Sequence, residues 1–268
     1  MATRPYRAVA AALLLGLTLW VWALAGALFA LRWNSIERPN PPLRALFPYG
    51  EMRIGVDASY PPFAAAGNDG LYGLDIDLGT IIAAQLGAPV RFVNMGYDGL
   101  YDSLKADQVD VLISALLIDY SRTDEVFYSI PYYNAGLTLV VPSDSPIHGM
   151  SDLSGLSLAY EFGSDADLQA RQWLRRVAPF TPRPYELPTL ALDAARIGDS
   201  SAALVDATSA RLYLRQHQDW NTSLIPTSDA LYALAVRTDH GLTLEALNRE
   251  LEKLLGDGTV AALIAKWL

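Results

Sequence analysis

Short apolar segments alternate with helical segments along most of this chain, and this alternation limits the fold more than any other feature. MRIGVD at 52–57 and VRFVN at 90–94 have the length and composition of buried strands. Between them, residues 74–87 carry apolar side chains at helical spacing and end at a glycine. Apolar strands separated by helices form mostly parallel sheets that are covered on both faces. The sequence therefore predicts an α/β protein.

The pattern occurs twice. The first occurrence continues with a short helix in 99–106, a buried strand at 109–115 and a helix that Ser121 is suited to cap. It then starts again, with segments at 136–142, 156–160, 168–176, 192–197 and 202–206. A strand at 230–236 and two amphipathic helices in 242–268 end the chain. We therefore expect two α/β units.

An uncharged stretch occupies residues 8–31 near the N-terminus. At 1.5 Å per residue it is long enough to cross a hydrocarbon layer about 30 Å thick. Arg4 and Arg7 precede it, which favours a cytoplasmic N-terminus and an extracytoplasmic remainder. Small residues near its end also permit cleavage, so residues 1–31 are either a transmembrane signal-anchor or a signal peptide.

Residues 32–50 contain four prolines and show no helical or strand periodicity, which is typical of a linker. The folded domain is therefore expected over 51–268. That region holds 28 acidic and 15 basic residues, which disfavours binding to nucleic acid. The chain has no cysteine, so disulfides, thiolate metal sites and a lipidated cysteine are excluded. It also lacks a glycine-rich phosphate loop and paired histidines, and we expect no cofactor or metal.

Polar residues stand where several predicted strands end. They are Asp57, Ser114, Asp206 and the loop after Tyr160. Ligands bind at the carboxyl ends of the strands in open α/β sheets. The sequence therefore predicts that these residues surround a ligand site.

Several ordered motifs carry a resemblance to a known family. They are DASYPPF at 57–63, LYGLDIDL at 71–78, GYDGLYDSL at 96–104, VDVLIS at 109–114 with SR at 121–122, YSIPYYNAG at 128–136 and DGTVAALIAKWL at 257–268. Together they resemble the periplasmic amino-acid-binding proteins, the family 3 solute-binding proteins of ABC importers.

The resemblance implies a two-lobed, periplasmic-binding-protein-like fold of type II, preceded by one N-terminal membrane helix. Each lobe would hold a mostly parallel sheet flanked by helices. Lobe one would comprise 51–133 and 231–268, and lobe two 137–228. Two hinge strands would join the lobes, which close over a ligand between them.

The resemblance also implies roles for individual residues. Arg122 matches the arginine that pairs with the ligand's α-carboxylate, although an arginine in a first helical turn is otherwise a surface ion-pair partner. Asp206 matches the acid that holds the α-amino group, with a helix N-cap as the alternative role.

Further residues complete the expected site. Tyr60, Phe63 and Tyr97 match positions where rings flank the ligand, although Phe63 could equally pack in the core. Asp57 matches a position that reaches the ligand side chain, or else bonds the backbone of the proline-rich turn. Ser114 and Ala115 end the third strand beside them.

The chain departs from the family pattern at two places. Leu117 stands where a serine or threonine usually donates to the ligand carboxylate. The loop that usually reads Gly-Thr-Thr is Gly163, Ser164 and Asp165 here, with Glu161 just before it. Because Asp165 would repel a ligand carboxylate, it is expected to turn away, to cap the helix that follows, or to meet a cation.

We therefore expect an extracytoplasmic binding protein for an amino acid, delivering it to an ABC-type permease. Asp57, Glu161 and the acidic balance favour a basic ligand such as arginine, lysine or ornithine. Two alternatives stay open. One is an enzyme of the same fold, such as a cyclohexadienyl dehydratase, with Glu161 or Asp165 as a general acid. The other is the ligand-sensing domain of a membrane receptor.

Overall fold

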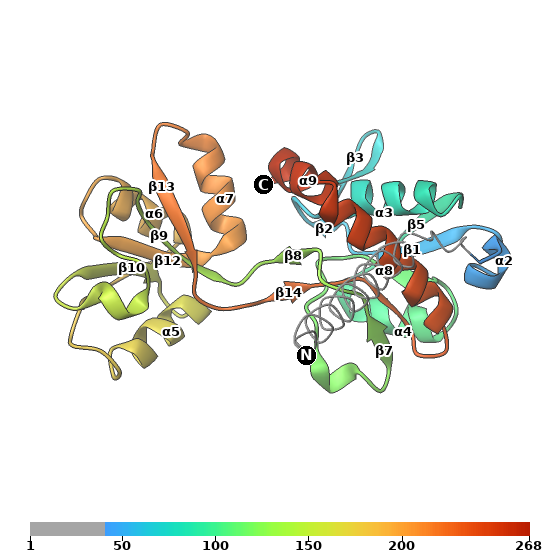
Figure 1. The fold of residues 1–268 in the computed structure, drawn as a ribbon, viewed down its shortest axis with the longest axis horizontal. Helices are drawn as coiled ribbons and strands as arrows, with labels where there is room; N and C mark the ends of the chain where they lie inside the picture. Colours follow the sequence, from blue (N-terminus) through green and yellow to red (C-terminus); the bar gives the residue numbers. More distant parts are fainter. Residues whose placement is uncertain (1–40) are drawn as a thin grey trace, which may run out of the picture. The chain divides into compact units, whose positions relative to one another are not determined.

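The structure, a computed structural model, describes residues 41–268 (Figure 1). Within this part of the chain, two five-stranded sheets form the centres of two lobes. The sheet of lobe one has the strand order β5-β1-β6-β15-β7 and that of lobe two the order β11-β10-β12-β9-β13. The predicted α/β architecture with two units is therefore present.

The strands of lobe one are β1 (Met52–Val56), β5 (Val90–Asn94), β6 (Val111–Leu112), β7 (Val126–Tyr128) and β15 (Ala235–Arg237). Those of lobe two are β9 (Leu137–Pro142), β10 (Ser157–Glu161), β11 (Thr181–Tyr185), β12 (Ala202–Asp206) and β13 (Thr222–Pro226). A small sheet of β2 (Ser59–Tyr60), β3 (Ala64–Gly67) and β4 (Gly70–Tyr72) follows β1.

Both large sheets are mixed rather than mostly parallel. In lobe one, β1 runs parallel to β5 and β6, whereas β15 runs antiparallel to β6 and β7. In lobe two, β10 runs parallel to β11 and β12, whereas β9 runs antiparallel to β12 and β13. β9 and β15 are each the first strand of their sheet after the chain has crossed from one lobe to the other. They therefore enter the sheet in the direction opposite to that of their neighbours.

The helices of lobe one are α2 (Leu43–Leu46), α3 (Leu74–Gln85), α4 (Leu100–Lys105), α8 (Gly241–Gly256) and α9 (Thr259–Trp267). Lobe two has α5 (Asp165–Trp173), α6 (Pro188–Arg196) and α7 (Ala207–Gln216). Short 3-10 helices occur at Tyr97–Gly99, Tyr120–Arg122 and Met150–Leu153.

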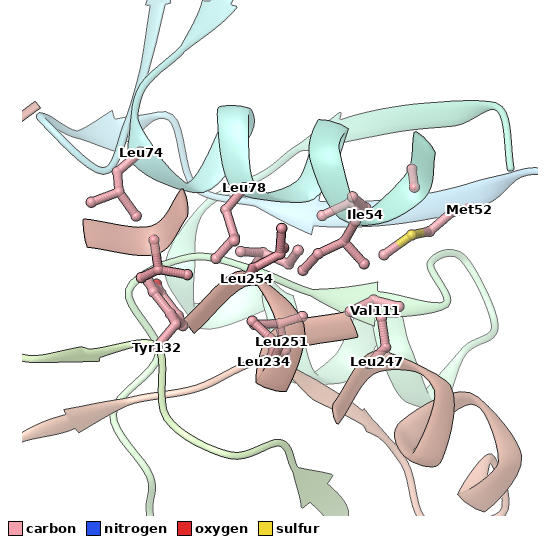
Figure 2. Packing of buried hydrophobic residues seen from close by; sticks show 14 of the residues in the cluster. Met52, Ile54, Leu74, Leu78, Val111, Tyr132, Leu234, Leu247, Leu251 and Leu254 are labelled. Atoms are coloured by element: carbon pink, nitrogen blue, oxygen red, sulfur yellow. The ribbon is translucent and has the colours of Figure 1, made fainter. Parts of the chain in front are cut away.

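The core of lobe one packs helices α3 and α8 against the sheet (Figure 2). Ile54 of β1, Leu78 of α3 and Leu247 of α8 belong to this cluster, and each is fully buried. Burying one such side chain contributes about 1.5–3 kcal/mol. Lobe two has two separate clusters, one on each face of its sheet.

Two short strands, β8 (Tyr133–Asn134) and β14 (Leu231–Tyr232), connect the lobes (Figure 1). They pair antiparallel, with Tyr133 opposite Tyr232. Where they enter lobe two, a Cβ on Gly136 would lie 2.0 Å from the carbonyl oxygen of Ser228. Only glycine therefore permits the two connections to approach so closely.

The linker prediction for 32–50 is wrong at its C-terminal end. Residues 43–46 form α2, and Leu46 and Phe47 are 1% and 0% exposed within the core of lobe one. A helix of four residues is too short to show a periodic pattern, and the neighbouring prolines concealed it.

Three local predictions also need correction. The strand expected at 109–115 is only Val111–Leu112, because the chain bends before Ala115, whose φ is +44°. Ser121 does not cap a helix; Asp119 accepts from its backbone N–H and caps a 3-10 turn instead. The strand expected at 230–236 is divided into β14 and β15.

Within residues 41–268, the structure contains no helix that is both long and apolar enough to cross a membrane. The predicted membrane segment at 8–31 and residues 32–40 of the predicted linker lie outside the described residues.

Candidate functional site

Three adjoining cavities contain most of the predicted site residues. The central cavity, of about 510 Å³, is lined by residues of both lobes and of the connecting strands. It shares Tyr97 and Leu117 with a second cavity in lobe one, of about 550 Å³. It shares Ala135, Asp165 and Ala230 with a third cavity in lobe two, of about 450 Å³. We call these the central, Arg122 and Asp206 cavities.

Asp57 lines the central cavity just after β1 ends. Its Oδ1 accepts hydrogen bonds from the backbone N–H and hydroxyl of Ser59, at 2.9 and 2.7 Å. Its Oδ2 accepts from the backbone N–H of Tyr97 at 3.0 Å. All three donors are neutral, so they hold the carboxylate in place without cancelling its charge.

Ser114 ties two strand ends together. Its hydroxyl oxygen accepts the backbone N–H of Asp57 at 2.9 Å, and the residue is 5% exposed. The contact links the turn after β1 to the turn after β6. Ser114 therefore holds together two turns that line the central cavity.

The aromatic residues divide into two roles. Tyr60 and Tyr97 line the central cavity and are 49% and 46% exposed. Phe63 is 1% exposed and lies behind Tyr60, with the rings stacked at 5.6 Å between centroids. Phe63 also contacts Tyr232 edge-on at 5.3 Å. Phe63 therefore packs in the core and supports the cavity wall.

Leu117 presents an apolar side chain, 46% exposed, to both the central and the Arg122 cavities. Two residues earlier, Ala115 lines the central cavity with its backbone in the left-handed region. Its N–H donates to Asp75 Oδ2 at 2.7 Å.

Arg122 ends a 3-10 turn and lines the cavity that carries its name. Its Nε lies 3.4 Å from Asp119 Oδ2, and its Nη1 lies 3.3 Å from Glu125 Oε2. The guanidinium carbon lies 4.6 Å from the centroid of the Tyr101 ring. The side chain is 44% exposed, so these contacts are weak and exchangeable.

The Asp206 cavity has an acidic lining. Asp206 Oδ1 accepts the Ser209 N–H at 2.8 Å and so caps α7, as the alternative role predicted. Asp206 also lines the cavity, together with Glu161, Ser164, Asp165 and Asp229. No arginine, lysine or histidine of the described residues lines this cavity or the central one.

Ser164, rather than Asp165, caps α5. Its hydroxyl oxygen accepts the N–H groups of Ala166 and Asp167 at 3.1 and 3.5 Å. Asp165 is the first residue of α5 and is exposed at the junction of the central and Asp206 cavities. A cation in either cavity would therefore meet its carboxylate.

The structure brings together seven predicted residues in the central cavity: Asp57, Tyr60, Tyr97, Ser114, Ala115, Leu117 and Asp165. Arg122 and Asp206 each line a different flanking cavity, and these two cavities have no lining residue in common. Sequence reasoning missed Tyr232 and Ser59, which line the central cavity, and Asp229, which lines the Asp206 cavity. Tyr232 belongs to the strand predicted at 230–236. Its place beside the central cavity follows from the division of that strand into β14 and β15.

The chain matches the family model described as bacterial extracellular solute-binding proteins, family 3, over residues 52–268. The L-cystine-binding protein TcyJ of Escherichia coli strain K12 is 27% identical over 226 residues, which cover 81% of this chain and 82% of the relative. The ABC transporter arginine-binding protein 1 of the same strain is 27% identical over 236 residues, covering 84% and 96%.

A solved structure shows the same fold. The L-cystine solute receptor of Neisseria gonorrhoeae, in its unliganded open conformation, matches with a TM-score of 0.72 at 22% identity, covering 85% of this chain and 97% of that one. The family match spans most of the chain, including both lobes. The chain therefore belongs to the family 3 bacterial extracellular solute-binding proteins.

Proposed function

We propose that this family 3 solute-binding protein captures an α-amino acid with a cationic side chain and delivers it to an ABC-type permease. The observation that carries the proposal is the charge of the cleft. Asp57 and Asp165 line the central cavity, and Glu161, Asp206 and Asp229 line the adjoining one. No basic side chain of the described residues lines these two cavities.

The energetics favour a cationic head group. Opposite unit charges 4 Å apart attract by about 4 kcal/mol at an effective dielectric constant of 20. The exposed rings of Tyr60 and Tyr97 can add cation–π attraction of about 0.5–2 kcal/mol. A neutral side chain would leave the Asp57 carboxylate desolvated without a charged partner, and an anionic side chain would be repelled by it.

The ends of the ligand are assigned to the flanking cavities. Arg122 would receive the α-carboxylate, exchanging its contacts with Asp119 and Glu125 for the ligand. Asp206 would receive the α-ammonium group through Oδ2, because Oδ1 is engaged by the helix cap. Closure of the lobes about β8 and β14 would bring these two groups onto one ligand.

The relatives support an amino acid as the ligand but do not identify which amino acid. One curated relative is named for L-cystine and another for arginine. Both names denote amino acids, and the acidic cleft favours the cationic one.

Thermal unfolding of the full-length protein with L-arginine, L-lysine, L-ornithine, L-cystine and L-glutamate tests the proposal. A ligand at 100 times its Kd stabilises the folded state by about 2.7 kcal/mol. We expect the three cationic amino acids to raise the melting temperature and glutamate to leave it unchanged. Stabilisation by cystine alone would refute the cationic ligand, and no stabilisation by any amino acid would refute the ligand class.

Arg122→Ala tests the carboxylate contact, with Arg91→Ala as its matched control. Both arginines are half exposed and ion-paired in lobe one, and Arg91 pairs with Glu51 away from the three cavities. We expect titration calorimetry to give at least a 100-fold weaker Kd for Arg122→Ala and a change within twofold for Arg91→Ala. Equal Kd values for both variants would remove Arg122 from the site.

We propose binding rather than catalysis for this cleft. The dehydratase alternative needs a carboxylic acid whose burial keeps it protonated. Asp165 is exposed and Glu161 is only half-buried, so neither has that environment. Loss of prephenate or arogenate absorbance on mixing with the protein would contradict the proposal.

The location and partner are also proposals. The family is described as extracellular, and residues 8–31 would hold the domain at the outer face of the membrane. Fractionation should find the protein with membranes, whereas a soluble periplasmic pool would indicate cleavage. Co-purification with a permease would support transport, and co-purification with a kinase alone would support the sensing alternative.

A further inference from the structure

A single buried carboxylate joins three segments that are distant in the sequence. Asp75, in the first turn of α3, is 0% exposed. Its Oδ2 accepts the backbone N–H of Ala115 at 2.7 Å, and its Oδ1 accepts the hydroxyl of Tyr132 at 2.7 Å. The contact therefore links helix α3, the turn after β6 and the start of the connection to lobe two.

The first partner belongs to the ligand cavity. Ala115 lines the central cavity with a φ of +44°. A non-glycine residue in this region is strained by about 1–3 kcal/mol and persists only where surrounding contacts hold it. The hydrogen bond to Asp75 is such a contact. Without it, Ala115 is expected to relax and to displace the residues that follow it, including Leu117.

The second partner belongs to the connection between the lobes. Tyr132 is 2% exposed and shares the core cluster with Leu74 and Leu78 of α3 (Figure 2). Its N–H donates to the carbonyl oxygen of Tyr232 at 3.0 Å, and strand β8 begins at the next residue. Asp75 therefore also fixes the point from which the first connecting strand leaves lobe one.

The environment of Asp75 is unfavourable for a charged group. Burial raises the pKa of Asp75 to about 7, against the lowering effect of its bonds to Tyr132 and Ala115. The facing titratable group is Tyr132, with Tyr232 beyond it, and no ion pair of Asp75 occurs among the described residues. A buried acid without an ion-pair partner lowers stability. The role of Asp75 must therefore lie in holding its two hydrogen-bond donors, Ala115 and Tyr132.

We propose that Asp75 is a positioning residue of the ligand site, which fixes the backbone of Ala115 in the cavity wall and the root of strand β8 through Tyr132. The inference rests on the proposed function for its effect on affinity. Its geometric part, the holding of Ala115 and Tyr132, is independent of any ligand.

Two measurements on the full-length protein test it, amide hydrogen exchange of the segment 113–117 and titration with L-arginine. Asp75→Ala removes both acceptors. We expect at least tenfold faster exchange at Ala115, beyond any change in global unfolding, and at least a tenfold weaker Kd. Asp75→Asn keeps one acceptor oxygen and should fall between Asp75→Ala and the unchanged protein.

Asp110→Asn is the matched control, because Asp110 is also a fully buried acid of lobe one but directly precedes β6, whereas Ala115 follows the other end of that strand. It should lower stability but change neither the Kd nor the relative exchange of Ala115 by more than twofold. Should Asp75→Ala fail to fold, Tyr132→Phe removes only one of the two bonds and should weaken the Kd about threefold.

The outcomes separate the two proposals. Unchanged exchange at Ala115 in a folded Asp75→Ala or Asp75→Asn variant would overturn the positioning role, as would an equal loss of affinity in Asp110→Asn. If the unchanged protein does not bind L-arginine, that result counts against the proposed ligand, and the exchange measurement alone decides the role of Asp75.

Discussion

Arg53 and Asp110 form a buried two-point ion pair between neighbouring strands of lobe one. Nη2 of Arg53 lies 2.7 Å from Oδ1 of Asp110, and Nε donates to Oδ2 at 3.0 Å. Their side chains are 6% and 0% exposed. Arg53 lies in β1 and Asp110 directly precedes β6. The pair therefore joins the starts of two neighbouring strands, at the end of the sheet away from Asp57 and Ser114.

Replacing Asp110 by alanine should destabilise the protein by about 3–5 kcal/mol, because it leaves a buried guanidinium with only its partner Asp107. Urea denaturation measures this loss. Glu51→Ala, which removes an exposed ion pair with Arg91 in the same lobe, should cost less than about 1 kcal/mol. Similar losses for the two variants would mean that water reaches the Arg53 pair.

The folded domain should need residues before 51. Phe47 is fully buried in the core of lobe one, and truncation of a buried phenylalanine to alanine typically costs about 3–5 kcal/mol. Phe47→Ala, or a chain that starts at residue 51, should therefore unfold at markedly lower urea concentration than a chain that starts at 41. Leu242→Ala, at a residue that is 57% exposed, should change stability by about 0.5 kcal/mol or less. A stable chain from 51 would contradict the assigned boundary.

The raised pKa of Asp75 predicts a pH dependence of stability. The pKa is about 7 in the folded protein and 3.8 ordinarily, so between these values the folded state holds one proton more than the unfolded state. The contribution of Asp75 to the free energy of unfolding should therefore fall as pH rises, by about 1.4 kcal/mol per pH unit, and level off above pH 7.

Comparison with Asp75→Asn isolates this effect, because the other titrating groups cancel in the difference. The stability of the unchanged protein minus that of the variant should decrease from pH 4 to pH 7 and then stay constant. Denaturation at five pH values provides the measurement. A difference that does not vary with pH would show that Asp75 ionises normally.

The alternation of strands and helices could be predicted from the sequence because buried strands and amphipathic helices leave strong local patterns. β1, β5, β9 and β12 lie where the apolar runs indicated. β11 was missed because its sequence, TPRPY, contains two prolines and is mostly exposed. The direction of β15 was missed because it depends on the chain having first crossed to lobe two and returned, which no local pattern records.

The candidate site was predictable where residues end strands and less so where loops decide. Asp57 and Ser114 were identified from their places at strand ends, and they meet through a hydrogen bond. Asp75 was read only as part of a helix, because its role depends on a partner 40 residues away. The contacts that hold Arg122 were also hidden, since Asp119 and Glu125 look like ordinary surface acids in the sequence.

Asp206 presents two roles that one pair of variants can separate. Its Oδ1 caps α7, and loss of a cap costs about 1 kcal/mol. Asp206→Ser keeps an oxygen that can accept the Ser209 N–H but removes the charge, whereas Asp206→Ala removes both. Asp206→Ser should therefore melt close to the unchanged protein, and Asp206→Ala lower by the value of one cap.

Ligand titration then distinguishes the roles. If the carboxylate receives the ammonium group of the amino acid, both variants should bind L-arginine at least 30-fold more weakly, because each loses a charge-assisted hydrogen bond of about 1.5–3 kcal/mol together with the Coulombic attraction. If Asp206 acted only as a cap, Asp206→Ser would bind like the unchanged protein. The ammonium contact would then have to come from another acid that lines the same cavity, and Glu161, Asp165 and Asp229 are the three candidates.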